Sequence, residues 1–309
     1  MCKINIKAAG EEYLAHLAAL NYSAKAIWTY QSIIRKLARA FPEGETEIKK
    51  ADVESWRDAQ SGSLSPNSLK AYMMSLNAFF TWYSETKNTQ NPFAGVDQPL
   101  TEERKYNLLT LADIEKLLTV RRKGGYSKND ARNYAIITVL ITSGLRSAEL
   151  RALRLCDLDF EKGTIKVRHG KGDKSRLAPF PTIAQNAVKE YMQSAGKIKS
   201  DDILFYSEYD EKGQISAAKS RKIKRHEMNS NGLAEMIERY VYDVTGRHGI
   251  HTHTLRHAAA SLWDDKGVDT RTIQKAMGHS SITTTERVYI AILDQSKAAV
   301  KINGAFDEK

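Results

Sequence analysis

Apolar side chains recur at intervals of three and four residues through most of this 309-residue chain, which predicts a fold built largely from amphipathic helices. In the first hundred residues two such stripes stand out, one from Ile27 to Leu37 and one from Leu69 to Tyr83. Ser65 and Pro66 precede the second stripe, as a capping residue and a proline at the first helical position. The aromatic residues of both stripes are expected to form core rather than to bind a ligand.

The helical pattern is interrupted by a loop rich in Asn, Gln, Pro and Gly, which runs from Lys87 to Pro99. The segment from Thr110 to Asp113 then has the pattern of a new helix N-terminus with a capping residue. We therefore predict two domains, a helical one over residues 1–100 and a second one over residues 105–309.

The second part of the chain mixes helices with a hairpin. One helix is predicted to end at Gly144, and a short helix is predicted to begin near Arg146. Alternating residues at 164–168 and 175–179 flank the turn residues Gly170 to Asp173, a pattern typical of a β-hairpin. The predicted fold class is therefore mainly α with a small β-sheet (α+β).

The positive charge of the chain is concentrated in this second part. The formal net charge of the chain is +10. The first hundred residues contain 11 basic and 10 acidic side chains, and the remaining 209 residues contain 36 basic and 27 acidic side chains. Such an excess indicates a polyanionic partner, usually nucleic acid, although solubility alone is an alternative explanation. No apolar run is long enough to span a membrane, and no export signal is visible at the N-terminus. We expect a cytoplasmic protein without membrane contact.

Three short stretches contain residue types suited to phosphate chemistry: 142–150, 253–257 and 278–289. On a helix, His253 and Arg256 share a face, and two arginines can hold a phosphate through paired N–H donors. A nearby histidine can donate a hydrogen bond or move a proton at neutral pH. A tyrosine hydroxyl becomes a useful nucleophile where cations stabilise the transition state, and a hairpin lysine can protonate a leaving alkoxide.

These stretches resemble the signature motifs of the tyrosine recombinases, also called the phage integrase family. Residues 143–150 are similar to the first arginine box of the family, and residues 170–176 resemble its β-hairpin lysine motif. Residues 253–257 match the second box, and residues 277–282 resemble the run that leads to the nucleophile. The four motifs stand in the order of the family across the whole second part. The first part resembles the helical core-binding (SAM-like) DNA-binding domain of such enzymes, on its helix pattern alone.

The resemblance implies six catalytic residues: Arg146, Lys171, His253, Arg256, His279 and Tyr289. Tyr289 would attack the scissile phosphate to give a 3′-phosphotyrosyl link, and the two arginines would bind the non-bridging oxygens. The two histidines would assist in proton handling, and Lys171 would be the general acid. Glu149 would support the site rather than do chemistry. Tyr289 lies ten positions after His279, where in many members of the family the distance is nine, but position 288 is a valine and cannot be the nucleophile.

The resemblance also implies a function and its partners. The chain would be a site-specific DNA recombinase that needs no cofactor, neither ATP nor a metal. Its partners would be a double-stranded DNA recombination site, three further copies of the chain in a homo-tetramer on DNA, and accessory or directionality proteins. The family includes phage, integron, mobile-element and chromosome-dimer-resolution enzymes, and the sequence does not choose among them.

Several other interpretations of the same residues remain open. His251, His253 and His257 have the spacing of a metal cluster, but no glutamate lies between them and an arginine there repels a cation. The chain could instead be a type IB topoisomerase-like strand nicking-closing enzyme, or a recombinase-fold DNA-binding protein without catalysis. The basic stretch 219–225 would either follow a phosphate backbone or form a solvated helix face. The tail from residue 294 to 309 is interpreted as a helix that docks onto a neighbouring subunit.

Overall fold

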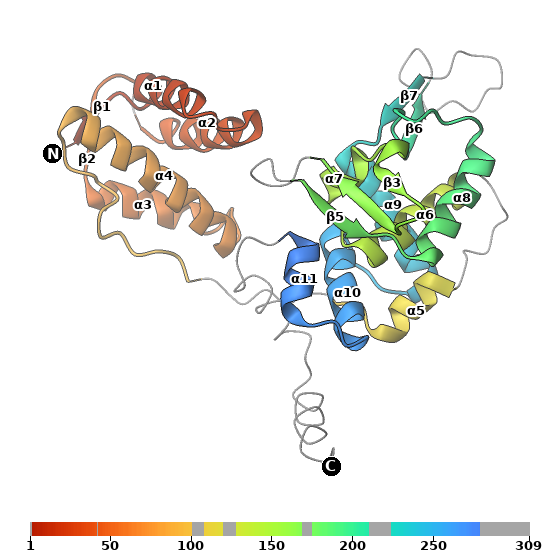
Figure 1. Ribbon diagram of the computed structural model, residues 1–309. Helices are drawn as coiled ribbons and strands as arrows, with labels where there is room; N and C mark the ends of the chain where they lie inside the picture. The colour runs from red at the N-terminus through yellow and green to blue at the C-terminus, as the bar shows by residue number, and fades with distance from the viewer. Residues whose placement is uncertain are drawn as a thin grey trace, which may run out of the picture. The chain divides into compact units, whose positions relative to one another are not determined.

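The chain divides into two compact units, Met1–Lys105 and Tyr106–Lys309 (Figure 1). Each unit contains an apolar core of its own. The computed structural model describes residues 2–41, 43–100, 108–119, 128–168, 175–209 and 224–278.

The first unit is built mainly from helices. Its elements in chain order are β1 (Cys2–Ile4), α1 (Ile6–Ala19), α2 (Ala24–Ala38), β2 (Thr46–Ile48), α3 (Lys50–Gln60) and α4 (Pro66–Lys87). The α4 helix begins as predicted, because the Ser65 side chain accepts the backbone N–H of Ser68 and Pro66 occupies the first turn. The Ser23 side chain caps α2 in the same way, through the backbone N–H of Ala26.

The apolar stripes of the sequence form the core of the first unit. Met73, Leu76, Phe79 and Phe80 of α4 are completely buried, and the Tyr13 ring of α1 lies with its centroid 5.3 Å from that of Phe79. The prediction of an aromatic core is confirmed for α4, where Tyr83 is buried as well, whereas Trp28 of α2 is 66% exposed. The unit, expected to be helical, also contains an antiparallel pair of strands, β1 with β2. Strands of three residues are too short for a recognisable alternation in sequence, so they were not predicted.

The second unit combines helices with small sheets. Its elements in chain order are α5 (Leu111–Thr119), α6 (Lys128–Ser143), α7 (Ser147–Arg151), η1 (Leu155–Asp157), β3 (Leu158–Asp159), β4 (Thr164–Val167), β5 (Arg176–Pro179), α8 (Thr182–Ala195), β6 (Tyr206–Tyr209), β7 (Lys224–Glu227), α9 (Ser230–Thr245), α10 (Thr252–Asp265) and α11 (Thr270–Met277). The helix start predicted at Thr110 is confirmed, because Thr110 and Asp113 form a reciprocal capping pair.

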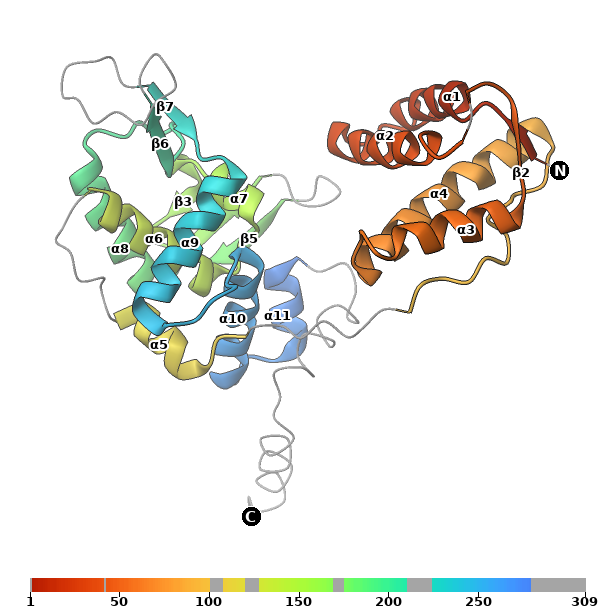
Figure 2. The same cartoon turned by 180° about the vertical axis from the view of Figure 1, so that it is seen from behind.

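Helix α6 lies at the centre of the second unit, with α8 and α10 packed against it (Figures 1 and 2). Every residue from Ala135 to Leu145 is buried, so this part of α6 and the turn after it belong to the core of the unit. The predicted end of α6 is also confirmed, since Gly144 has φ +62°. None of the helices in the described segments has the length and apolar character that a membrane crossing requires.

The predicted hairpin strands are present as β4 and β5, and β3 extends them to a three-stranded antiparallel sheet. Ile165 pairs with Ala178, and both are buried, so this face of the sheet covers the core. The predicted turn, residues 170–173, lies outside the described residues. A second antiparallel pair, β6 with β7, was not predicted.

Helices α10 and α11 lie side by side and share a small apolar cluster of their own (Figures 1 and 2). The buried members of that cluster are Ala259, Ala260, Ile273 and Met277. Gly144 has φ +62°, which strains a residue with a side chain, and a Cβ there would lie 2.9 Å from Sδ of Met277, so the end of α6 closely approaches the end of α11. The ends of these two helices, distant in sequence, therefore meet in the folded unit. The predicted fold class, mainly α with small sheets, is confirmed.

Candidate active site

Three of the six site residues predicted from the sequence lie in the described part of the chain. Arg146 precedes α7, and His253 and Arg256 lie on α10. Lys171, His279 and Tyr289 lie outside the described residues. The geometry of the site is therefore built from the first three residues and from what surrounds them.

Arg146 is the N-cap residue of α7, at the end of the turn that follows α6. Its backbone N–H donates to Oε2 of Glu149 at 2.8 Å, and its Nη1 donates to Oε1 of the same carboxylate at 2.8 Å. Its Nη2 donates to the carbonyl oxygen of Gly278 at 2.8 Å. Glu149 and the end of α11 thus fix the guanidinium from two sides, and 28% of the side chain stays exposed.

Arg256 lies on α10 and is 4% exposed. Its Nη1 donates to the carbonyl oxygen of Gly144, and its Nη2 donates to that of Met277. Burial first, and then the charges of Arg146 and Arg176, lower the pKa of Arg256 to about 9. The guanidinium still carries its charge at pH 7, in a place where a neighbouring anion would be strongly favoured.

A third arginine, Arg176 at the start of β5, completes the group. Its Nη1 and Nη2 donate to the two carboxylate oxygens of Glu149 at 2.7 and 2.8 Å. Burial alone would raise the pKa of Glu149, but the hydrogen bonds from Arg176 and Arg146 outweigh it and hold the pKa at about 2. Glu149 is therefore ionised at neutral pH and is shared by two arginines.

The C-terminal end of α11 meets all three arginines. The carbonyl oxygens of Ala276, Met277 and Gly278 are three consecutive backbone acceptors. They accept from Arg176, Arg256 and Arg146 respectively. The carbonyl end of a helix carries partial negative charge, so cations are stabilised there. Residues from β5, α10 and the start of α7 therefore converge on one point of the chain, directly before position 279.

The charges of this arginine cluster do not cancel. We use this name for Arg146, Arg176 and Arg256 together with Glu149. Three guanidiniums and one carboxylate leave a net charge of two positive. An anionic group bound beside the cluster would meet preorganised N–H donors in a partly water-excluded place.

The histidines of α10 lie next to this cluster. Burial, and the charges of Arg256 and Arg146, lower the pKa of His253, so its imidazole is mainly neutral at pH 7. Burial lowers the pKa of His257 to about 4, with further contributions from His253 and Arg256. In the described part of the chain, no group of His, Cys, Asp or Glu side chains has the arrangement of a metal site, His251, His253 and His257 included.

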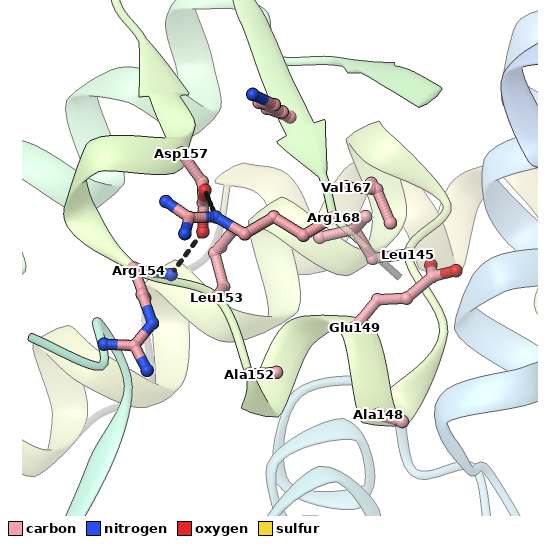
Figure 3. Close-up of a pocket in the computed structure, with 10 residues that line it drawn as sticks. Leu145, Ala148, Glu149, Ala152, Leu153, Arg154, Asp157, Val167 and Arg168 are labelled. Atoms are coloured by element: carbon pink, nitrogen blue, oxygen red, sulfur yellow. Dashed lines mark hydrogen bonds and ion pairs between the residues drawn. The ribbon is translucent and has the colours of Figure 1, made fainter. Parts of the chain in front are cut away.

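A cavity of about 390 Å³ lies between α7 and β4, beside the arginine cluster (Figure 3). Its apolar wall includes Leu145 and Val167. Figure 3 shows Glu149 at one side of the cavity and the ion pair of Arg168 with Asp157 at the other. Glu149 therefore both lines this cavity and belongs to the arginine cluster.

Replacing Glu149 by glutamine is expected to lower the free energy of unfolding of the second unit by about 3 kcal/mol, because two arginines lose a buried anionic partner. Urea unfolding of the full chain at pH 7 measures this change. The control is Glu227→Gln, which removes the partner of Arg151 at an exposed position and is expected to cost less than about 1 kcal/mol. Equal losses for the two variants would contradict the argument.

The lowered pKa of His257 predicts an acid-labile second unit. In the unfolded chain a histidine titrates near its usual pKa of 6.5, whereas in the folded unit His257 titrates near 4. Between these values the unfolded state binds the extra proton, so stability is present above pH 6.5 and falls as the pH drops toward 4. Urea unfolding is expected to lose about 2 to 3 kcal/mol between pH 7 and pH 4.5. The His257→Gln variant should lack most of this slope, and the exposed His248→Gln control should retain it.

Arg176 is the residue of the cluster to which sequence reasoning assigned no role. Arg176 is the last residue of the hairpin motif 170–176, but the motif does not indicate which residue it binds. The available signal was an arginine inside a short strand that otherwise reads Leu-Ala-Pro. A charged residue there needs a partner, but sequence alone does not identify Glu149, which lies 27 positions earlier.

The chain is similar to known proteins in sequence and in fold. The family model described as "Phage integrase family" matches residues 107–296. A tyrosine recombinase of Pseudothermotoga lettingae is 29% identical over 293 residues, which cover 93% of this chain and 93% of that protein. A tyrosine recombinase XerC of Syntrophus aciditrophicus is 30% identical over 227 residues, 71% of this chain and 68% of that protein. Among solved structures, the Tn1549 transposon integrase in complex with transposon right end DNA is similar in fold, with a TM-score of 0.72, 20% identity, and coverage of 97% of this chain and 99% of that one.

Proposed function

This chain belongs to the phage integrase family, and on that premise we propose that it is a site-specific DNA recombinase that breaks and rejoins strands through a 3′-phosphotyrosyl intermediate. The observation that carries the proposal is the convergence of three arginines on the last three carbonyl groups before His279. The family motif continues from that point to Tyr289, so the proposed nucleophile comes after the end of α11 in the sequence.

The proposed first step is an in-line displacement at one phosphodiester. The phenol oxygen of Tyr289 attacks phosphorus and its proton passes to His253, which can accept it because its imidazole is mainly neutral at pH 7. The bond from phosphorus to the 5′ oxygen breaks, and Lys171 gives that oxygen a proton. The products are a 3′-phosphotyrosyl link and a free 5′-hydroxyl, so the phosphoester bond is conserved in the enzyme–DNA adduct.

In the second step the 5′-hydroxyl of another strand attacks the phosphotyrosyl phosphorus. The bond from phosphorus to the tyrosine oxygen breaks, and the phenol recovers its proton. Because each step exchanges one phosphoester for another, the reaction needs no energy from ATP, and Lys171 and His253 exchange roles in proton transfer.

The arginine cluster suits the charge that develops in both steps. The pentavalent arrangement around phosphorus carries about two negative charges, and the cluster carries two positive ones. The described contacts of Arg146 and of Arg256 each use two of the five N–H donors of a guanidinium, so donors are left for the non-bridging oxygens. His279 would add a further hydrogen bond.

We further propose that the helical segment 1–100 is a DNA-binding domain. Recombination needs two duplexes and four strand cuts, so a homo-tetramer on DNA is the proposed assembly, with accessory or directionality proteins as additional partners. The basic excess of the second part supports DNA as the partner, since phosphates are its counterpart. The enzyme would act in the cytoplasm.

The test begins with selection of the preferred duplex from a random library, because the target site is unknown. A version of that duplex nicked beside the cut site loses a short fragment after cleavage, which traps the adduct. The expected result is a covalent protein–DNA complex whose 3′-phosphate maps to Tyr289 by peptide mass spectrometry. Selective binding without any adduct would instead support the DNA-binding protein without catalysis. Relaxation of supercoiled DNA without exchange between two sites would support the topoisomerase-like alternative.

A further inference from the structure

We propose that Arg176 is a positioning residue for strand cleavage, which acts by orienting Glu149 and through it Arg146. This inference rests on the proposed function, because it concerns the rate of the same reaction. Arg176 would not touch the substrate phosphate itself. Its effect would come from the orientation of Glu149 and Arg146 in the arginine cluster.

The first argument is the geometry of the link from Arg176 to Arg146. The Arg176 guanidinium binds both oxygens of Glu149, at 2.7 and 2.8 Å, and the same two oxygens accept the backbone N–H and the Nη1 of Arg146. The side chains of Arg176 and Glu149 are 12% and 6% exposed. A paired, largely buried contact of this kind fixes the plane of the carboxylate, and the carboxylate in turn fixes the Arg146 side chain.

The second argument is the contact of Arg176 with the end of α11. Its Nε donates to the carbonyl oxygen of Ala276 at 3.1 Å. A Cβ added to Gly278 would lie 2.9 Å from Cδ of Arg176, so the Arg176 side chain lies directly on this glycine, whose φ is +64°. Gly278 is also the residue whose carbonyl binds Arg146. Arg176 therefore holds both partners of Arg146, namely Glu149 and the end of α11.

The third argument is that the contacts of Arg176 need the planar geometry of a guanidinium. Arg176 is the first residue of β5 and lies five positions after Lys171 in the sequence. A lysine at position 176 would keep the charge but would offer a single ammonium in place of a planar fork with three fixed donors. It could not bind both Glu149 oxygens and the Ala276 carbonyl in the same directions. The Arg176→Lys variant therefore tests orientation rather than charge.

The experiment compares Arg176→Lys with the wild-type chain on the nicked duplex under single-turnover conditions. The cleavage rate is expected to fall roughly 10²-fold, since small displacements of a catalytic group have effects of that size. The dissociation constant for intact duplex should change less than about threefold, because Arg176 is not a phosphate contact. A matched control is Arg168→Lys, which alters another arginine bound to a buried carboxylate, directly after Val167 of β4, the residue that pairs with Arg176.

A second substrate tests how the effect arises. In a methylphosphonate one charged non-bridging oxygen is replaced by a neutral methyl group, so the position of Arg146 matters less. The loss caused by Arg176→Lys should then shrink to roughly fivefold or less. The inference is overturned if Arg176→Lys cleaves the phosphodiester at the wild-type rate, if Arg168→Lys loses as much, or if the loss is equal on both substrates. If the wild-type chain itself forms no adduct, the proposed function fails, and that result is separate from these.

Discussion

A Tyr289→Phe variant of this chain is expected to bind its DNA site normally and to form no covalent adduct with it. The substitution removes one oxygen atom, which is the only atom of the side chain that can form a bond to phosphorus. The phenol contributes little to duplex affinity, which comes mainly from contacts of basic groups with phosphates. Cleavage should therefore disappear while the dissociation constant stays within about threefold of the wild-type value.

The measurement for this variant is adduct formation on the nicked duplex, beside binding to the intact duplex. Tyr242→Phe is the matched control, because Tyr242 on α9 is a partly exposed tyrosine of the same unit and the nearest one upstream of Tyr289. Its adduct yield should equal that of the wild-type chain. An adduct formed by Tyr289→Phe would show that another residue is the nucleophile and would overturn the proposed mechanism.

An Arg256→Lys variant is expected to cleave roughly 10³-fold more slowly than the wild-type chain, in line with the loss of one preorganised donor group at a transition state. Arg256 reaches the carbonyl oxygens of Gly144 and Met277 from two separate nitrogens of a planar group, whereas a lysine has a single nitrogen and cannot reproduce this geometry. Its ammonium would also be poorly hydrated at a position that is 4% exposed. The first effect displaces the positive charge, and the second disfavours the charged form of the side chain.

Single-turnover cleavage and urea unfolding of the same preparations separate these effects. If the slower cleavage reflects loss of transition-state stabilisation, it should persist at temperatures where the variant remains fully folded. The control is Arg247→Lys, since Arg247 pairs with Asp113 of α5 at a half-exposed position in the same unit. Wild-type cleavage by Arg256→Lys, with the unit folded, would exclude the proposed role of this guanidinium.

The features of the fold that depend on neighbouring residues could be predicted from the sequence. Ser65 and Pro66 begin α4, and Thr110 with Asp113 begins α5, because capping uses side chains and backbone within one turn. The end of α6 followed from Gly144 for the same reason. The strand pair of β1 with β2 could not be predicted, since three residues give no alternation and the partners lie more than forty positions apart.

Some features of the candidate site could likewise be predicted from the sequence, and others could not. The motifs indicated that Arg146 and Arg256 belong together, although 110 positions separate them, and a resemblance in residue order was needed for that inference. The contacts that orient them include backbone carbonyls at the end of α11, and any residue type supplies a carbonyl. Such contacts leave no trace in the sequence. The pairing of Arg176 with Glu149 is equally invisible, because it depends on how β5 lies against α7.

The burial of the pair formed by Arg176 and Glu149 has a consequence for experiments at different ionic strengths. Dissolved ions screen exposed charges over about 10 Å at 0.1 M salt, but they reach a buried pair poorly. Added salt should therefore lower the affinity for duplex DNA steeply, because the release of counterions from the DNA becomes less favourable. The contacts among the buried arginines and Glu149 should persist. A preparation eluted from DNA in concentrated salt should thus recover its full cutting rate on dilution, without a slow refolding phase.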